Sequence, residues 1–159
     1  MRRALRQPVR ARYNFRCGYC GVSETNIGAE MTIDHFVPRV QGGGDTLDNL
    51  VYCCHPCNEF KGDYWQTEPD LSLLNPLLDF IVSHYRLQEE GTLIGLTERG
   101  RNHLHVLHLN RPELVAFRLE QQEIALLRQR NQELRQMLEV AKLINQHLET
   151  ELEQQTGTT

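Results

Sequence analysis

Two Cys-x-x-Cys pairs set the strongest limit on how this chain can fold. Cys17 and Cys20 form the first pair, and Cys54 and Cys57 form the second. Four thiolates in this arrangement favour one tetrahedral zinc site without an open position, so the metal would be structural. The alternative, reduced cysteines buried in a core, explains two matched pairs poorly. Cys53 is left over, because only Cys54 repeats the spacing of the first pair.

The segment between the pairs must hold a structure of its own, because it is longer than the usual zinc-ribbon loop. Apolar alternation and β-branched residues predict one short strand within 30–37 and another at 48–52. Residues 41–45 are polar and rich in glycine, which predicts an open connection between the strands. Residues 55–62 begin with a proline in the first turn and end on a glycine, as a short helix does. The local order is therefore strand, strand, helix.

Residues 12–63 resemble the HNH endonuclease family in its zinc-bearing form. The residues that carry the resemblance are the pair Asp34-His35, Asn49 and Asn58, framed by the two cysteine pairs. The resemblance implies a ββα-metal finger in which His35 is the general base and Asp34 and Asn58 bind a catalytic divalent metal. It also implies that Asn49 holds the hairpin loop and thereby orients the base. This chain has the His-Asn-Asn variant of the pattern, and its amide ligand is weaker and uncharged.

The chemistry of phosphodiester cleavage agrees with these assignments. The reaction needs a base whose pKa lies near neutrality, and histidine supplies one. It also needs a cation that polarises the phosphoryl oxygen and stabilises the leaving alkoxide. A carboxylate and an amide oxygen, from Asp34 and Asn58, suit Mg²⁺ or Mn²⁺. Taken singly, the Asp-His pair could be a surface turn and Asn58 a helix-start residue.

Basic residues gather near the N-terminus, although the net charge of the chain is −4. A run of arginines precedes the first acidic residue, Glu24, whereas the end of the chain is rich in Glu and Gln. Clustered arginines favour contact with a nucleic-acid backbone, and a solvated positive face is the alternative. The candidate nucleic-acid contacts are Arg10, Arg12, Arg16, Arg39 and Lys61.

The segment after residue 112 predicts one long helix, because residues 113–155 contain neither Gly nor Pro. A heptad repeat runs along it, and asparagines at alternate first positions are typical of a parallel two-stranded coiled coil. We therefore expect a homodimer, and the alternative is a helix packed on the core of its own chain. The two seams of the repeat are Ile124, Asn131, Leu138, Asn145 and Leu152, and Leu127, Leu134, Ala141 and Leu148.

Between the two regions, Thr92 to Thr97 predicts a strand, and Thr97 could cap a short helix at 99–107. Asn110 is expected to cap the long helix. The histidines at 103, 105 and 108 cannot share one helix face, so we expect solvated or half-buried side chains rather than a second metal site.

The predicted fold class is α+β, with a ββα-metal finger and its structural zinc, a small α/β segment and a long C-terminal helix. The expected regions are 1–63, the nuclease domain with its basic arm; 64–112, an accessory segment; 113–155, the coiled coil; and 156–159, a disordered tail. No run of about eighteen apolar residues and no secretory signal is present, so a cytoplasmic location is expected.

These observations predict a metal-dependent HNH endonuclease that hydrolyses nucleic acid, DNA more than RNA. The expected partners are a second copy of the chain and a protein or guide that supplies specificity. The alternatives are a non-catalytic zinc module that binds nucleic acid and an interaction protein whose working part is the coiled coil.

Overall fold

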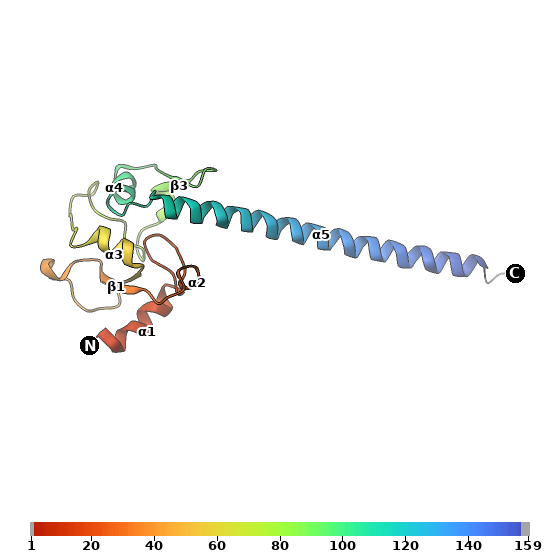
Figure 1. The fold of residues 1–159 in the computed structure, drawn as a ribbon, viewed down its shortest axis with the longest axis horizontal. Coiled ribbons are helices and arrows are strands. Elements are labelled where there is room, and N and C mark those ends of the chain that lie inside the picture. Colours follow the sequence, from red (N-terminus) through yellow and green to blue (C-terminus); the bar gives the residue numbers. More distant parts are fainter. Residues whose placement is uncertain (1, 157–159) are drawn as a thin grey trace. The chain divides into compact units, whose positions relative to one another are not determined.

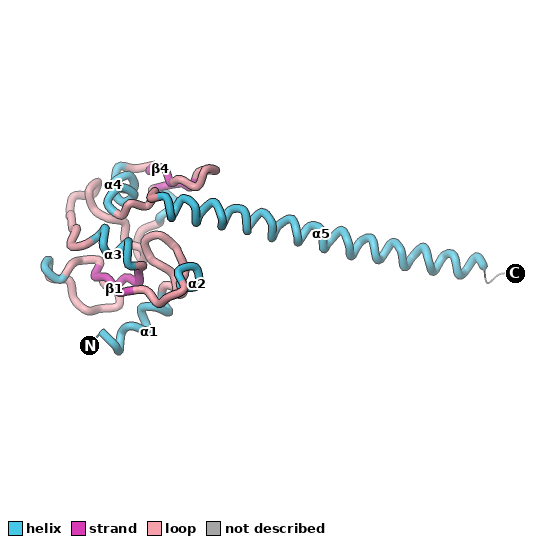
Figure 2. The backbone as a smooth tube through the Cα atoms, viewed as in Figure 1, coloured by secondary structure: helices cyan, strands magenta, loops and turns pink. Residues whose placement is uncertain are grey.

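The computed structural model describes residues 2–156, and the chain divides into two units, Met1–Leu119 and Glu120–Thr159 (Figure 1). The first unit contains short strands and helices joined by long loops, whereas the second is helical (Figure 2). The predicted α+β class with a long C-terminal helix is confirmed.

A β-hairpin and the helix that follows it form the centre of the first unit. Strand β1 (Thr32–His35) pairs with β2 (Leu50–Cys53) in antiparallel register, so that Thr32 lies opposite Cys53 and His35 opposite Leu50. Helix α3 (His55–Lys61) follows at once and lies beside β1 in Figure 1. The predicted order of strand, strand and helix is confirmed, and a short 3-10 turn, η1 (Arg39–Gln41), begins the loop of the hairpin.

The ends of α3 follow from local sequence. Pro56 occupies the first turn, where an amide hydrogen would have no helical acceptor. Gly62 ends the helix with φ +47°, a backbone conformation that side-chain-bearing residues rarely adopt. The buried face of α3 carries Cys57 and Lys61, so one side of this short helix faces both the thiolates and the hairpin.

Helix α1 (Arg2–Arg12) and α2 (Glu24–Ile27) precede the hairpin. After α3, a short turn η2 (Ile81–Ser83) leads to β3 (Tyr85–Leu87), which pairs with β4 (Leu93–Gly95). Helix α4 (Glu98–Val106) comes next, and the hydroxyl of Thr97 accepts from the amide of Gly100, which confirms the predicted cap.

Two predictions in this region are wrong. Asn110 does not cap the long helix: its side chain pairs with both backbone groups of Leu93 at 2.8 and 2.7 Å and so fastens β4. His103 is 1% exposed rather than solvated or half-buried, and its Nδ1 accepts the amide hydrogen of Leu74 at 3.1 Å. Burial lowers the pKa of His103 to about 3, so the ring remains neutral and structural.

One apolar core joins both ends of the first unit. Val9 of α1 and Tyr52 of β2 are fully buried in it, as are Leu107 and Leu109, which follow α4. Leu114, in the first turn of the long helix α5 (Pro112–Thr156), belongs to the same core. The accessory segment therefore shares its core with the zinc-bearing hairpin and is not a separate layer.

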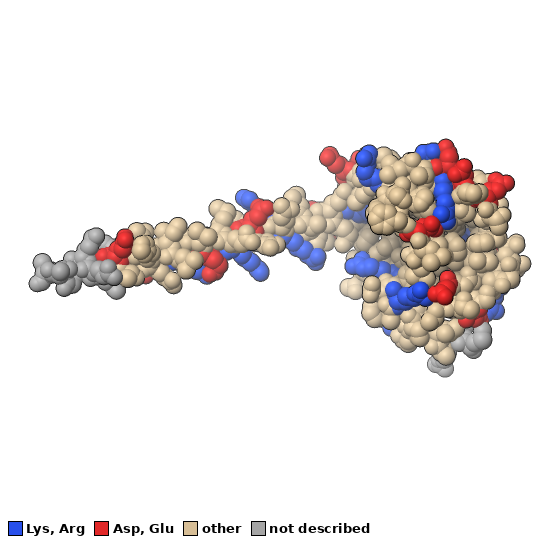
Figure 3. Space-filling view, turned by 180° about the vertical axis from the view of Figure 1, so that it is seen from behind, with Lys and Arg blue, Asp and Glu red and all other residues tan. Residues whose placement is uncertain are grey.

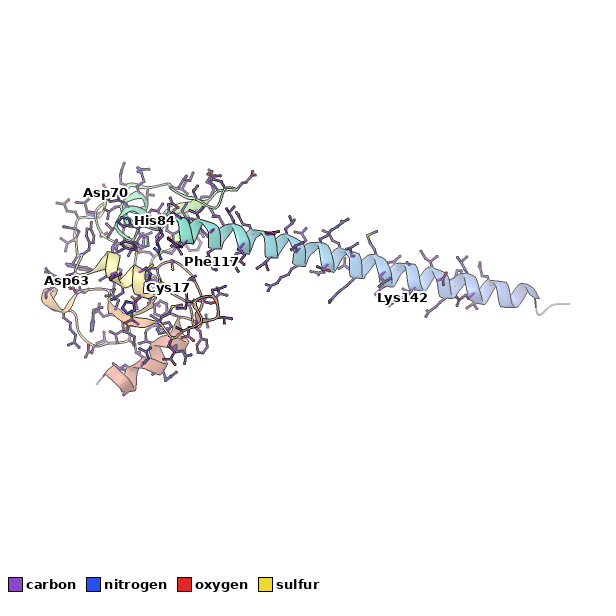
Figure 4. The ribbon with its side chains drawn as sticks, in the orientation of Figure 1. Cys17, Asp63, Asp70, His84, Phe117 and Lys142 are labelled. Atoms are coloured by element: carbon purple, nitrogen blue, oxygen red, sulfur yellow. The ribbon has the colours of Figure 1, made fainter. Side chains whose placement is uncertain are left out.

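The second unit is the greater part of α5. Its large apolar side chains are exposed in the single chain, and Figure 4 shows side chains projecting from the helix on either side of the labelled Lys142. Of the predicted seam positions, Leu127, Leu134, Leu138 and Leu148 are each about half exposed. The side chain of Leu152 and residues 157–159 of the predicted tail lie outside the described residues. No helix in the described part of the chain is both long and apolar enough for a membrane span.

Candidate nuclease site and zinc centre

The four paired cysteines converge on one point, as their spacing predicts. The Sγ atoms of Cys17, Cys20, Cys54 and Cys57 all lie within 4.8 Å of one another, and those of Cys20 and Cys54 are 3.7 Å apart. With zinc–sulfur bonds of about 2.3 Å, a tetrahedral site needs sulfur separations of about 3.8 Å. The donor set therefore fits a structural zinc ion with four thiolate ligands. Among the described residues this is the one group of His, Cys, Asp and Glu that converges in this way.

Arg111 lies against the thiolates. One guanidinium nitrogen is 3.5 Å from Cys57 Sγ and 3.9 Å from Cys54 Sγ. A zinc ion with four thiolates carries a net charge of −2, so this contact offsets negative charge beside a partly buried centre. Arg111 also covers the ring of Phe60 on α3, with its guanidinium carbon 5.5 Å from the ring centre.

Cys53 is excluded from the zinc centre. Its thiol donates instead to Oδ1 of Asn58 at 3.8 Å, and burial raises the pKa of this thiol well above its ordinary value. The sulfur of Cys54, and not that of Cys53, thus lies with those of Cys17, Cys20 and Cys57.

The side chain of Asp34 in β1 is buried, and one of its oxygens contacts both a hydroxyl donor and a cation. Its Oδ2 accepts the hydroxyl of Tyr19 at 2.6 Å and lies 3.1 Å from Nζ of Lys61. Burial raises the pKa of Asp34, and the nearby Lys61 charge and the Tyr19 hydroxyl oppose that rise. Because Tyr19 stands between the zinc ligands Cys17 and Cys20, the zinc loop directly positions this carboxylate.

His35 is the last residue of β1, and its side chain is 12% exposed. Its Nε2 lies 2.6 Å from Oδ1 of Asp45, a residue in the loop of the hairpin. Arg39 reaches the same carboxylate oxygen with one nitrogen and lies 3.2 Å from His35 Nε2 with another. The pKa of Asp45 is lowered, first by its hydrogen bond from Arg39 and then by that from His35.

Asn49 closes the hairpin loop through three hydrogen bonds. Its Oδ1 accepts the amide of Val37 at 2.8 Å, and its Nδ2 donates to the carbonyls of Val37 and Gly44 at 3.1 and 3.0 Å. The loop passes so close to these groups that a Cβ on Gly43 would lie 1.7 Å from the Val37 carbonyl oxygen. The loop can therefore take this path only with glycine at position 43.

Asn58 of α3 lies on the same side of the hairpin as Asp34. Asp34 and Cys53 lie on the same face, because β1 pairs Asp34 with Val51 and side chains alternate along a strand. Asn58 lies against Cys53, and Lys61, one turn further along α3, reaches Asp34. The two predicted metal ligands therefore lie on the same face of the hairpin.

The candidate phosphate contacts are largely engaged within the protein. Arg10 pairs with Glu24 at 2.6 Å, Arg12 with Asp48 at 2.9 Å, and Arg16 donates to the carbonyl of Gly21 at 3.1 Å. Figure 3 accordingly shows acidic side chains interspersed among the basic ones on the face that it draws.

Lys61 differs from these arginines, because its side chain is buried. Its Nζ donates to the carbonyl of His35 at 2.8 Å as well as approaching Asp34. This position gives Lys61 an internal contact with the two central residues of the site.

Three residues of the centre were not identified from the sequence: Tyr19, Asp45 and Arg111. Tyr19 could have been noticed from its place inside the first cysteine pair, which fixes its backbone. Asp45 and Arg111 carry no local signal, because their partners, His35 and Cys57, are brought close only by the fold.

Part of the chain that forms this site is similar in sequence to known proteins. Residues 17–63 match the family model described as HNH endonuclease. A 53-residue segment is 49% identical to the CRISPR-associated endonuclease Cas9 of Corynebacterium diphtheriae, covering 33% of this chain and 5% of that protein. The Septu protein PtuA of Bacillus mycoides is 22% identical over 139 residues, or 68% of this chain and 19% of that protein.

The chain thus spans only a small part of the length of either relative, and no solved structure matches it. The matched segment nevertheless contains all four zinc-site cysteines together with Asp34, His35, Asn49 and Asn58. Residues 17–63 of this chain therefore form a domain of the HNH endonuclease family.

Proposed function

We propose that the chain is a metal-dependent endonuclease that hydrolyses phosphodiester bonds of nucleic acid, with DNA as the preferred substrate. The observation that carries the proposal is the arrangement around β1. Asp34 and His35 are consecutive in one strand whose loop is closed by Asn49, and α3 presents Asn58 towards the face that carries Asp34. A base and a hard oxygen donor thus come from adjacent positions of one strand, on a scaffold held by a thiolate centre.

In the proposed reaction His35 removes a proton from a water molecule, whose oxygen attacks the phosphorus and displaces the sugar oxygen. Asp34 and Asn58 would hold Mg²⁺ or Mn²⁺, which supplies charge to the phosphoryl oxygens and to the departing alkoxide. The resemblance to the family implies that the new end carries a 5′-phosphate. Asn49 keeps the loop in place and so maintains the direction of the His35 ring.

Plasmid nicking in Mg²⁺ or Mn²⁺ tests the proposal. The wild type and His35→Ala are compared, with His105→Ala as a matched control because His105 is exposed on α4. A general base contributes about 10²- to 10⁴-fold, so His35→Ala should lose at least about 100-fold while the control retains activity. Equal nicking by wild type and His35→Ala removes His35 from the mechanism. The absence of nicking in any divalent metal favours a zinc module that only binds.

DNA and RNA are distinguished by the same cleavage assay on DNA and RNA oligonucleotides of matched sequence.

The ion pairs of Arg10 and Arg12 indicate that either arginine must exchange its acidic partner for phosphate before it can contact nucleic acid. Binding that depends on these residues should therefore weaken steeply as salt increases. We propose that a protein or guide partner supplies sequence specificity.

We further propose that α5 forms a parallel coiled coil with a second copy of the chain. Its seam leucines are exposed in the single chain, and helices in proteins gain most of their stability by packing an apolar face against a partner. Two nuclease sites in one dimer could cut both strands of a duplex. Light scattering should give the dimer mass for the wild type and the monomer mass for Leu134→Asp; a monomeric wild type at micromolar concentration contradicts the proposal.

A further inference from the structure

Asp45 is a buried carboxylate that directly contacts the proposed base. Its side chain is 6% exposed, and its Oδ1 lies 2.6 Å from Nε2 of His35. The second oxygen, Oδ2, is buried and has no hydrogen-bond partner among the described residues. A buried carboxylate with one unsatisfied oxygen is costly, so its retention beside His35 calls for an explanation.

We propose that Asp45 is the positioning residue of the nuclease site: it accepts the Nε2–H of His35 and so leaves Nδ1 as the atom that takes the proton from water. The proposal rests on the proposed function, in which His35 is the base. To that function it adds that Nδ1 is the ring nitrogen of His35 that reacts, and that Asp45 is the side chain that determines this tautomer.

The assignment follows from the donors and acceptors available. An ionised carboxylate can only accept, so the short contact to Asp45 requires a hydrogen on Nε2. A neutral imidazole carries one hydrogen, and Nδ1 then holds the lone pair that a base needs. Arg39 Nε also directs its hydrogen at Nε2 from 3.2 Å, a contact that would need a lone pair on this nitrogen. If Nε2 accepted from Arg39, however, two acceptors would face each other at 2.6 Å, which is repulsive, so the guanidinium is paired with Asp45.

The same contact explains how Asn49 acts on the base at a distance. The hydrogen bonds of the Asn49 side chain go to Val37 and to the carbonyl of Gly44, the residue directly before Asp45. Asp45 then holds the ring. Asn49 therefore acts on His35 through the loop and Asp45, and Arg39 holds the same oxygen of the Asp45 carboxylate.

Kinetics on the full chain test the proposal. The variants are Asp45→Ala, Asp45→Asn and, as a matched control, Asp70→Asn, an exposed aspartate outside the hairpin. Misplacement of a base costs about 10- to 100-fold, so Asp45→Ala should lower kcat by that factor with KM and the metal requirement unchanged. Asp45→Asn retains an acceptor oxygen and should recover part of the loss, and the control should match wild type. Unchanged zinc content and thermal unfolding separate these effects from misfolding.

Two further measurements show whether Asp45 acts through His35. In a His35→Ala background, Asp45→Ala should cause no additional loss, because coupled residues are not additive; an equal further loss in that background overturns the proposal. Nitrogen-15 NMR of the histidine rings should place the hydrogen of His35 on Nε2 in wild type and lose that preference in Asp45→Ala. A hydrogen on Nδ1 in wild type overturns the proposal, and this readout needs no cleavage. Equal nicking by wild type and His35→Ala would instead mean that the proposed function fails.

Discussion

Replacing Tyr19 with Phe removes a single oxygen atom that joins the zinc loop to the proposed metal ligand. The Tyr19 hydroxyl donates to Asp34 Oδ2 at 2.6 Å, and both side chains are buried. Burial first, and then the nearby Asp34 charge, raise the pKa of Tyr19 well above its ordinary value, so the hydroxyl remains a donor. The ring of Phe fills the same space, so the change is confined to the hydrogen bond.

The expected effect can be derived from this contact. A hydrogen bond to a charged group contributes about 1.5–3 kcal/mol, and about 1.4 kcal/mol corresponds to a factor of ten in binding. Loss of a partner that orients a metal-binding carboxylate typically weakens metal affinity about 10- to 100-fold. Tyr19→Phe should therefore raise the Mn²⁺ concentration for half-maximal nicking about tenfold and leave the maximal rate at saturating Mn²⁺ nearly unchanged.

The assay is a Mn²⁺ titration of plasmid nicking, with direct Mn²⁺ binding followed by electron paramagnetic resonance. Tyr13→Phe is a close control, because the Tyr13 hydroxyl is also buried but has no hydrogen-bond partner among the described residues. Zinc content should be the same in both variants. If the Mn²⁺ requirement of Tyr19→Phe stays within twofold of wild type, or becomes tighter, the inference that Tyr19 orients Asp34 for metal is refuted.

Three further predictions concern stability and the zinc centre. Lys61→Met leaves the buried Asp34 carboxylate without its cation, and urea denaturation should show a loss of about 3–5 kcal/mol; a loss below about 1 kcal/mol contradicts a buried pair. His103 has a folded pKa of about 3 against about 6.5 unfolded, so the unfolded state binds a proton first and stability falls as pH drops below 6.5. Between pH 7.5 and 5.5 the wild type should lose about 1.4 kcal/mol more than His103→Gln, and parallel curves would refute this. Arg111→Met should release zinc to a chromogenic chelator about tenfold faster, because a positive contact to the thiolates is lost; an unchanged rate would leave Arg111 without that role.

The parts of the site that were predictable are those set by short sequence distances. The paired cysteines, the hairpin around Asp34 and His35, and the proline and glycine at the ends of α3 each depend on a spacing of a few residues. Over so few residues, backbone geometry limits the possible local structures, and the tertiary fold need only be compatible with them. The convergence of the four thiolates is the clearest case.

Other features depend on contacts between distant segments, which periodicity does not report. Asn110 is a residue type that often caps helices, but its side chain is hydrogen-bonded to the backbone of Leu93, seventeen residues away. His103 lies in a polar-looking helix yet is buried because Tyr19 and Tyr85 pack near its ring. Strand β3 is only three residues long, and its first residue is half-buried while the other two are exposed, so no alternation identifies it. Asp45 similarly gains its importance only when the loop returns to His35.

The contact of Arg111 with the thiolates also determines how long a segment must be transferred to a chimeric protein if the zinc centre is to stay intact. The family match ends at residue 63, yet a zinc-facing cation comes from residue 111 and core leucines from positions 107, 109 and 114. A chimera that borrows residues 17–63 alone would leave one side of the metal centre uncovered and would expose apolar surface. The segment to transfer is therefore the compact unit Met1–Leu119, and recombination within it should be tolerated less well than recombination at its C-terminal border.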